Sequence, residues 1–162
     1  MMLHIRNAGA MDASAMADLL NEIIAIGGTT AITESVVADD MLRRMNSAPE
    51  HSSWLLAEDD QGRLMGFQWI TPDPDHGPDA AEIATFARVG QTGTGIGSKL
   101  FSATSKAAKK LGYKYIIATI RADNEGGLIY YRSRGFEDYS SLKDCLLDNG
   151  QIVDKIVKRY EV

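Results

Sequence analysis

Apolar residues along the chain recur at helical spacing in two clear stripes. The first stripe predicts an amphipathic helix that ends at Gly27-Gly28, and it consists of Met16, Leu19, Leu20, Ile23 and Ile24. The second predicts a helix that ends at Gly112, and it consists of Ile96, Leu100, Ala103, Ala107 and Leu111. Weaker patterns predict two more helices, over residues 37–45 and 125–134. We therefore expect about four helices.

Short apolar runs between these helices predict strands. Their ranges are 2–6, 54–58, 65–71, 81–89, 115–120, 136–141 and 152–160. The turn residues Asp59-Asp60-Gln61-Gly62 predict a hairpin between the second and third strands. Residues 71–79 hold three of the four prolines and are expected to form a surface loop. Because strands and helices interleave without a repeat or linker, we predict one mixed α/β domain of the α+β class over residues 1–162.

The composition narrows the classes of partner. Lys and Arg number 17 against 22 Asp and Glu, and the formal net charge of −5 argues against nucleic acid or an anionic membrane as the main partner. A single cysteine, Cys145, excludes an internal disulfide, and three scattered histidines give no metal-ligand pattern, so no metal is expected. Residues 1–14 lack the pattern of a secretory leader, and no apolar run reaches membrane-spanning length. We therefore expect a cytoplasmic protein.

A cluster of glycines, Gly93-Thr94-Gly95-Ile96-Gly97-Ser98, lies between a predicted strand and a predicted helix. Closely spaced glycines let backbone N–H groups surround an anion, and the helix dipole favours phosphate at that end. Ser98 stands where a dinucleotide-binding turn has its last glycine, and the Gly-Lys pair of a P-loop is missing. From these residues alone, a phosphate-binding turn and a tight turn without a ligand remain equally open.

A second segment, residues 121–136, gives the glycine turn its context. Its spaced residues are Asn124, Gly127, Tyr131, Gly135 and Phe136. Together the two segments resemble the GNAT superfamily of acetyl-CoA-dependent N-acetyltransferases, in which the turn cradles the CoA pyrophosphate and a tyrosine of the later run lies near the thioester sulfur. The resemblance implies a central, mostly antiparallel mixed sheet of about seven strands flanked by about four helices. It also implies acetyl-CoA as the cosubstrate.

The resemblance places cofactor contacts in two regions. The pyrophosphate turn corresponds to Thr92, Gly93, Thr94, Gly95, Ile96, Gly97 and Ser98, with Thr92 where the family usually has Arg or Gln. Backbone groups of the preceding strand are expected to polarise the thioester and pair with the pantetheine arm, at Phe86, Ala87, Arg88 and Val89. Asn124 is expected to contact the same arm, and a helix cap is the equally open alternative for this residue.

Acyl transfer from a thioester to an amine needs a base for the amine and a proton for the departing thiolate. Tyr131 fits the acid role, because a phenol stays protonated at neutral pH. The alternative is a tyrosine packed at a helix interface, and the neighbouring Tyr130 is the obvious misassignment.

Glu82 lies at the interval before the glycine turn that the proposed base has in the phosphinothricin-type branch of the family. Strand alternation predicts Glu82, Ala84 and Phe86 on one face, where burial would raise the pKa of the carboxyl group. Glu82 would then act as the base, directly or through a water molecule. The alternative is a solvated glutamate at a strand end.

Three features resemble the phosphinothricin and L-amino-acid N-acetyltransferases, namely residues 29–34, Ala81-Glu82 and residues 150–154. The resemblance implies transfer of the acetyl group, by direct attack in a ternary complex, to the primary amine of an amino-acid-like small molecule. Members of this branch commonly pair, so a homodimer to which the C-terminal strands contribute is also expected.

The acceptor site is expected to include Thr33, Glu34 and Glu82. A turn rich in Thr and Gly also fits a plain connection, which is the alternative for Thr33 and Glu34. Arg88 either binds an acceptor carboxylate or is exposed. Two other functions remain open, acetylation of a protein or peptide and a catalytically silent CoA-binding module.

Overall fold

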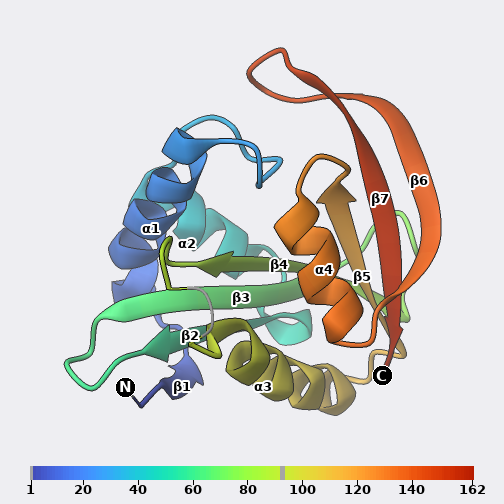
Figure 1. The fold of residues 1–162 in the computed structure, drawn as a ribbon. Helices are drawn as coiled ribbons and strands as arrows, with labels where there is room; N and C mark the ends of the chain where they lie inside the picture. The colour runs from blue at the N-terminus through green and yellow to red at the C-terminus, as the bar shows by residue number, and fades with distance from the viewer. Residues whose placement is uncertain (1, 92–93) are drawn as a thin grey trace.

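Seven strands form one mixed sheet in the computed structural model, which describes residues 2–91 and 94–162 (Figure 1). The strands are β1 (His4–Asn7), β2 (Ser53–Glu58), β3 (Leu64–Pro72), β4 (Ala80–Ala87), β5 (Tyr115–Arg121), β6 (Glu137–Leu146) and β7 (Ile152–Glu161). Their order across the sheet is β1-β2-β3-β4-β5-β7-β6. Every neighbouring pair is antiparallel except β4 and β5, which are parallel. The predicted mixed, mostly antiparallel sheet is confirmed.

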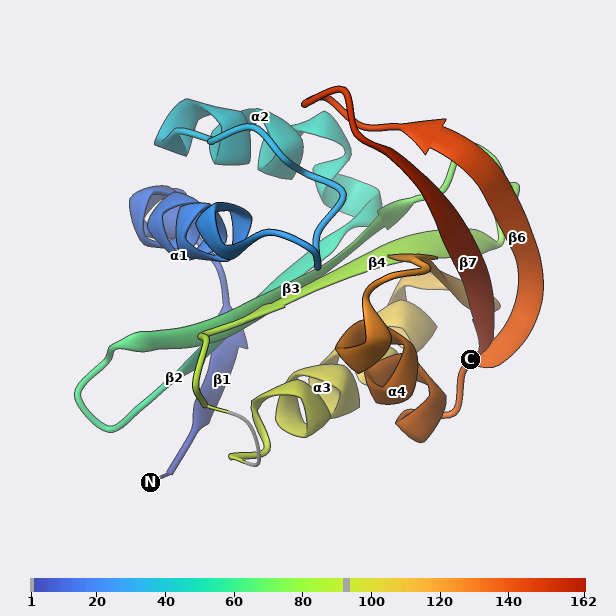
Figure 2. The ribbon, with the colours of Figure 1, turned by 45° about the horizontal axis from the view of Figure 1, so that its top comes forward.

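Two helices cover each face of this sheet (Figure 2). On one face lie α1 (Ala13–Ile26) and α2 (Ala38–Ser47), and on the other lie α3 (Ile96–Leu111) and α4 (Glu125–Ser133). The four predicted helices are confirmed, and Gly27 and Gly112 form the C-caps of α1 and α3. Within the described part of the chain, no helix is long and apolar enough to cross a membrane.

The core is divided between the two faces of the sheet. Against α1 and α2 lies an aromatic cluster that includes Trp54, Phe67, Trp69 and Phe86, with the two indole rings stacked 4.4 Å apart between centroids. Against α3 and α4 lies a second cluster, which includes Phe101, Ile116, Tyr131 and Phe136. Both faces of β3 and β4 are therefore covered, so polar side chains on these two strands are held in a largely apolar environment.

β4 and β5 stay paired over a short length. Their parallel register joins residues 80–82 of β4 to residues 115–117 of β5. Beyond that point β4 continues along β3, while β5 continues along β7. Figure 1 shows the two strands parting there. The backbone edges that face each other across this divergence belong to the strand expected to hold the pantetheine arm and to the strand that leads into α4.

The edge strands differ from the predicted ranges. β6 continues to Leu146, well beyond residue 141, and β1 begins at His4 and not at Met2. Nine of the ten side chains of β6 are exposed, and its register with β7 shifts near Asp138 and again after Leu142. An exposed, irregular edge strand needs no alternation of apolar and polar residues, which is why the sequence pattern did not reveal its length.

Candidate functional site

Tyr131 lies on α4 and is held by packing and by one hydrogen bond. Its ring packs against Phe136, with centroids 5.1 Å apart, and the side chain is 7% exposed. Its Oη lies 2.8 Å from the Oγ1 atom of Thr85 on β4. Burial raises the pKa of Tyr131 well above that of a free phenol, against the lowering effect of the Thr85 hydrogen bond. The phenol therefore keeps its proton throughout the physiological pH range.

Glu82 lies on β4 at the last registered pair with β5, opposite Ile117, and at the same position it faces Thr71 on β3. Ala84 and Phe86 pack in the aromatic cluster under α1 and α2, so the predicted face shared by Glu82, Ala84 and Phe86 agrees with the structure. Thr85 and Tyr131 meet on the opposite face. Because β4 and β5 part at Glu82, the two faces are no longer separated there by a continuous backbone ladder.

The electrostatic environment of Glu82 is acidic. Burial raises the pKa of Glu82, and the negative charges of Asp73 and Asp75 raise it further, while Lys155 and His76 act in the opposite direction. The charge of Glu82 in turn contributes to the raised pKa of Tyr131, behind burial and Tyr130. Tyr131 is connected to the strand of Glu82 through Thr85, and the catalytic roles of the two residues stay predictions.

Asp73, in the loop between β3 and β4, is a residue that the sequence reasoning missed. It is 5% exposed, its Oδ1 accepts from the backbone N–H of Asp75 at 2.9 Å, and its Oδ2 lies 2.9 Å from the Nδ1 atom of His76. The proline-rich composition of residues 71–79 predicted a surface loop. A carboxylate buried inside that loop was not visible in the composition.

A polar network joins β3, β4 and α4 behind Tyr131. Gln68 on β3 is fully buried, and its Nε2 donates to Thr85 Oγ1 at 2.9 Å and to Tyr130 Oη at 3.1 Å. Tyr130 donates in turn to the backbone oxygen of Gly97 at 2.8 Å. The sequence reasoning missed this network, although a lone glutamine inside the apolar run of β3 was the available signal.

The glycine turn leads into the N-terminus of α3. Gly95 has a φ of +81°, a left-handed conformation that glycine adopts without strain, and it forms the N-cap. The side chain of Ile96 is 3% exposed and packs in the core, so what Ile96 offers a ligand is its backbone N–H. Thr92 and Gly93 lie outside the described residues. The described part of the turn has the helix N-terminus on which the phosphate prediction depends.

Side chains around the turn hold it against α4. Ser98 Oγ accepts a hydrogen bond from Arg134 Nη1 at 2.8 Å, and Thr94 Oγ1 donates to the backbone oxygen of Gln91 at 2.7 Å. A Cβ on Gly97 would lie 2.6 Å from the ring of Tyr130, so this glycine makes room for a side chain of α4. The structure therefore brings the guanidinium of Arg134 to the N-terminal end of α3, next to the glycine turn.

Arg88 has partners that the sequence did not predict. Its Nε and Nη2 donate to the backbone oxygen of Leu64, its Nη1 contacts Glu22, and its backbone N–H donates to Met65. The guanidinium thus fastens the end of β4 to β3 and α1. This arrangement matches neither of the two predicted alternatives for Arg88, an exposed side chain or one that binds an acceptor carboxylate. Nearby, Phe86 is buried, and Ala87 and Val89 are exposed.

Asn124 forms the cap of α4, which was one of its two predicted roles. Its Oδ1 accepts from the backbone N–H of Gly127 at 3.0 Å, and its Nδ2 donates to the backbone oxygen of Thr29. A Cβ on Gly127 would lie 2.4 Å from Nδ2, which explains the small residue at this position of the motif. The contact with the pantetheine arm stays a prediction.

The loop between α1 and α2 is tied to the C-terminal half of the chain. Besides the bond from Asn124, Arg121 donates to the backbone oxygen of Thr30 at 3.2 Å. Thr33 Oγ1 accepts from the backbone N–H of Asn149, in the turn between β6 and β7, at 3.1 Å. Glu34 is exposed. Thr33 therefore holds two loops together, and its predicted acceptor contact and that of Glu34 remain untested.

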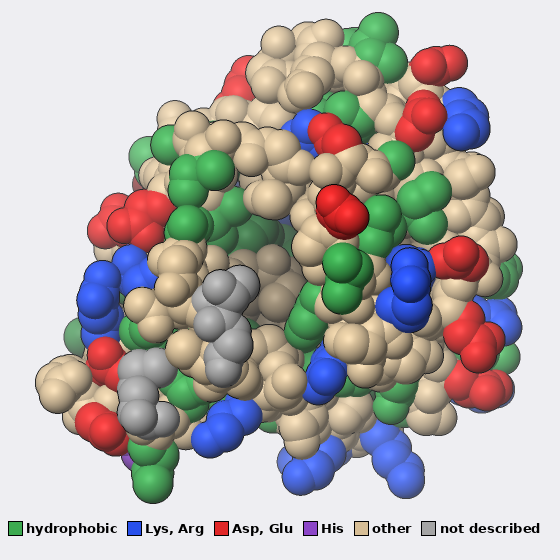
Figure 3. All heavy atoms as spheres, viewed as in Figure 1, with side chains coloured by type: hydrophobic (Ala, Val, Ile, Leu, Met, Phe, Trp, Pro, Cys, Tyr) green, Lys and Arg blue, Asp and Glu red, His purple; other side chains and the backbone are tan. Residues whose placement is uncertain are grey.

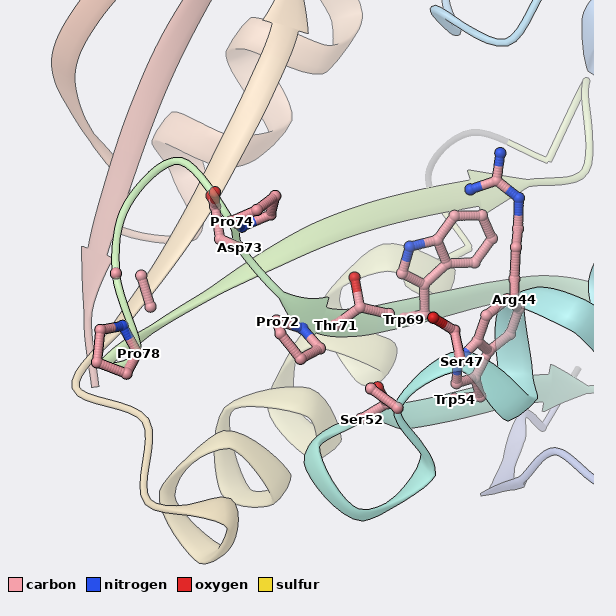
Figure 4. Close-up of a pocket in the computed structure, with 13 residues that line it drawn as sticks. Arg44, Ser47, Ser52, Trp54, Trp69, Thr71, Pro72, Asp73, Pro74 and Pro78 are labelled. Atoms are coloured by element: carbon pink, nitrogen blue, oxygen red, sulfur yellow. The ribbon is translucent and has the colours of Figure 1, made fainter.

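A cavity of about 610 Å³ opens beside the loop that follows β3 (Figure 4). Its walls include the stacked indoles of Trp54 and Trp69, and the guanidinium of Arg44 lies 5.6 Å from the Trp69 ring. Thr71 and Asp73 line its inner side, where Thr71 is the cross-strand neighbour of Glu82. The space-filling view also shows a hollow with hydrophobic side chains between α1 and α4 (Figure 3).

Titratable side chains in residues 2–91 and 94–162 form no group of three or more His, Cys, Asp or Glu that could hold a metal ion.

Comparison with known proteins decides the family. Residues 20–136 match the model of the Acetyltransferase (GNAT) family. The chain belongs to this family. Membership agrees with the seven-stranded sheet and four helices of this GNAT protein.

Individual relatives show the fold without deciding the acceptor. Mycothiol acetyltransferase of Paenarthrobacter aurescens (strain TC1) is 32% identical over 103 residues, which are 61% of this chain and 32% of that protein. The match spans 27% to 32% of the length of these curated relatives. A phosphinothricin acetyltransferase from Sinorhizobium meliloti, solved in complex with AcCoA, has a TM-score of 0.87 at 21% identity and covers 100% of this chain and 89% of its own.

A ribosomal-protein-alanine N-acetyltransferase from Brucella melitensis is just as similar in fold. Its TM-score is 0.88 at 22% identity, with 98% of this chain and 99% of that chain covered. Proteins named for a small-molecule acceptor and for a protein acceptor thus share this fold equally well. Fold similarity therefore leaves the branch to be argued from the site itself.

Proposed function

We propose that the protein transfers an acetyl group from acetyl-CoA to the primary amine of a small, amino-acid-like molecule, by direct attack in a ternary complex. The observation that carries this proposal is that both groups are held at β4: Glu82 lies where β4 and β5 part, and Tyr131 is hydrogen-bonded to Thr85, three residues further along the strand. A carboxylate with a raised pKa and a phenol that keeps its proton are the base and the acid that this reaction needs.

The cosubstrate would lie across the divergence of β4 and β5. The N-terminus of α3 at Gly95, Ile96 and Gly97 offers backbone N–H groups to the pyrophosphate, and Arg134 supplies the positive charge that Thr92 lacks. The facing backbone edge of β4, from Phe86 to Val89, would pair with the pantetheine arm and polarise the thioester carbonyl. The Arg88 N–H already donates to Met65, and backbone groups two residues apart in a strand point the same way. Phe86 therefore also faces β3, and Ala87 and Val89 carry that role.

In the reaction, Glu82 takes a proton from the acceptor amine, directly or through a water molecule. The neutral amine nitrogen forms a bond with the acetyl carbon, the bond between that carbon and the sulfur breaks, and the nitrogen releases its remaining extra proton to water as the amide forms. Tyr131 donates its proton to the departing thiolate, so CoA leaves as a free thiol. Tyr131 then regains a proton from water, and Glu82 returns its proton to water. Burial of Glu82 makes it a stronger base than a solvated carboxylate, which suits proton removal from an ammonium group near neutral pH.

The acceptor would enter from the cavity beside Glu82. Trp54 and Trp69 offer a broad apolar wall, and Arg44 stands above the Trp69 ring with its guanidinium exposed for an acceptor carboxylate. An amino-acid-like molecule with a flat or bulky apolar side chain satisfies both features at once. A peptide acceptor is the second candidate, supported by the equal similarity to the ribosomal-protein-alanine enzyme.

The proposal is tested by release of free CoA thiol from acetyl-CoA over a panel of amines. The panel contains aromatic and aliphatic L-amino acids, phosphinothricin, methionine sulfoximine, polyamines and a short peptide. Release of CoA with the amino acids supports the proposal. Release with the peptide alone would show that the acceptor is a peptide. Calorimetry with acetyl-CoA completes the test, since tight binding without release from any amine identifies a silent binding module.

We also propose that the protein forms a homodimer through β6 and β7. Leu146 and Ile152 are cross-strand partners, and they are 73% and 64% exposed. Two large exposed apolar side chains side by side, one on the edge strand β6 and one on its neighbour β7, are a surface that a second copy would cover.

A further inference from the structure

We propose that Gln68 and Thr85 are positioning residues that direct the hydroxyl proton of Tyr131 away from the sheet and toward the thioester sulfur. The inference rests on the proposed role of Tyr131 as the acid. It adds that the direction of this proton is fixed by a chain of hydrogen bonds that begins in the glycine turn and ends at Tyr131.

The first step concerns Tyr130. Its Oη donates to the backbone oxygen of Gly97 at 2.8 Å, and a phenol has a single proton to give. In its contact with Gln68, at 3.1 Å, Tyr130 must therefore accept. Only the NH₂ group of the Gln68 amide can donate, so this contact fixes which way the amide is turned.

The second step concerns Thr85. Once the amide is turned in this way, its second N–H donates to Thr85 Oγ1 at 2.9 Å. The proton of the Thr85 hydroxyl then needs an acceptor. Tyr130 Oη also lies near this hydroxyl but already accepts from Gln68, whereas Tyr131 Oη lies at 2.8 Å and has no other donor among the hydrogen bonds of the described residues. Thr85 is thus the donor, and Tyr131 is the acceptor.

The third step concerns Tyr131 itself. Since its oxygen accepts from Thr85, its own proton is free to point elsewhere. The ring is otherwise packed against Phe136 and Tyr130, and the thioester proposed to lie at the divergence of β4 and β5 is the group toward which this proton would be directed. A donor aimed there is prepared for a sulfur that becomes negatively charged during the reaction.

The burial of Gln68 supports this assignment. The side chain is fully buried on the central strand β3, and its Oε1 has no hydrogen-bond partner among the described residues. An unpaired buried oxygen weakens the fold, and an apolar residue of similar size would avoid that loss. What the glutamine provides in return is two donors in a fixed direction, one for Tyr130 and one for Thr85.

The chain also connects two parts of the site. Gly97 lies in the first turn of α3, at the end expected to hold the pyrophosphate, and its lack of a Cβ admits the Tyr130 ring. A contact that fixes the position of α3 therefore also fixes Tyr130, and through Gln68 and Thr85 it orients Tyr131. The geometry joins the binding end of the site to the acid.

The test compares Thr85→Val, which keeps the shape and removes the hydroxyl, with Thr85→Ser, which keeps the hydroxyl. With acetyl-CoA and an acceptor found in the amine panel, we expect Thr85→Val to lower kcat about 10-fold with the KM for acetyl-CoA unchanged, and Thr85→Ser to retain most of kcat. Adding Thr85→Val to Tyr131→Phe should lower kcat no further, because the hydroxyl acts through Tyr131.

Two results would overturn the inference while leaving the proposed reaction intact. One is full kcat in Thr85→Val when Tyr131→Phe is impaired, and the other is a Thr85→Val loss of equal size in the Tyr131→Phe background. Gln68→Met, which removes both donors, should reproduce the loss of kcat if Thr85→Val folds poorly.

A measurement without any acceptor keeps the two proposals apart. At pH 7, the carbon-13 shift of Tyr131 Cζ should change in Thr85→Val and be restored in Thr85→Ser, because the phenol oxygen loses and regains a donor. An unchanged shift in Thr85→Val overturns the hydrogen-bond direction, whatever the amine panel shows. Failure of the panel with the expected shifts would instead overturn the proposed function alone.

Discussion

At the scale of single residues, burial acts on Glu82 and Tyr131 in the same direction and serves opposite roles. Burial penalises the charged form of each group and so raises the pKa of both. For a carboxylate this strengthens the base, and for a phenol it preserves the acid. The two side chains reach this state from opposite faces of the sheet, because the backbone between them opens at Glu82.

The charges around Glu82 predict opposite shifts in the pH dependence of the reaction. The base must be ionised, so the rate rises with pH through the raised pKa of Glu82. Asp75→Asn removes a charge that raises this pKa and should move the acidic limb to lower pH, while Lys155→Gln should move it to higher pH. Each shift should be about 0.3 of a pH unit, since water screens both charges. Shifts of the same sign in the two variants would exclude Glu82 as the titrating base.

Glu82 also predicts a cost in stability. Its pKa is higher in the folded than in the unfolded state, so the folded state holds the proton more tightly. The free energy of unfolding should therefore fall as the pH rises from the unfolded pKa through the folded one. Glu82→Gln should abolish acetyl transfer yet raise the melting temperature at pH 7, with no such gain below the unfolded pKa. A lower melting temperature at pH 7 would contradict the linkage.

Motif spacing selected Tyr131 and Glu82 from the sequence, and the structure places Tyr131 on α4 and Glu82 on β4, while their catalytic roles remain predictions. Arg88 could not be placed, because its partners Glu22 and Leu64 are far away in the sequence. Gln68 and Asp73 could not be found for a similar reason, since burial of a polar group is a property of the packed molecule.

At the scale of secondary structure elements, α3 is fitted closely against β3 and α4. A Cβ on Gly66 of β3 would lie 2.7 Å from the side chain of Ile96 and 2.8 Å from the backbone oxygen of Phe86. The glycine therefore sets how near the first turn of α3 approaches the sheet. The helices themselves were predictable from periodicity, whereas this approach depends on contacts between elements.

The close approach predicts the effect of a single methyl group. Gly66→Ala should lower the free energy of unfolding by about 1–3 kcal/mol, because backbone atoms must shift to admit it. The matched control is Gly126→Ala on α4, where the nearest atom would lie 4.0 Å away, and its effect should stay under about 0.5 kcal/mol. Urea unfolding of both variants measures the difference. Equal free energies of unfolding would show that α3 moves away from the sheet at little energetic cost.

At the scale of the whole molecule, the exposed face of β6 and β7 is the feature that a single copy does not explain. β6 was predicted too short, because an exposed edge strand gives no alternating pattern. Its apolar side chains Leu142 and Leu146 are nonetheless exposed, as is Ile152 on β7. Such a surface is consistent with the proposed homodimer.

The dimer predicts a change of mass on substitution. Leu146→Glu together with Ile152→Glu places like charges in the surface and should convert a dimer into a monomer at micromolar concentration. Met11→Glu is the control, since Met11 is 97% exposed near the start of α1 and away from β6. Sedimentation or light scattering gives the masses. A monomeric mass for the unsubstituted protein would refute the dimer.

The short register between β4 and β5 is a narrow junction between two parts of the sheet. Within the described residues, three backbone pairs join the part of the sheet made by β1–β4 to the part made by β5–β7. A molecule bound along the divergence would contact both parts of the sheet and hold them together. Binding of the cosubstrate should then slow amide hydrogen exchange in both parts of the sheet together, so that the two parts unfold as one cooperative unit.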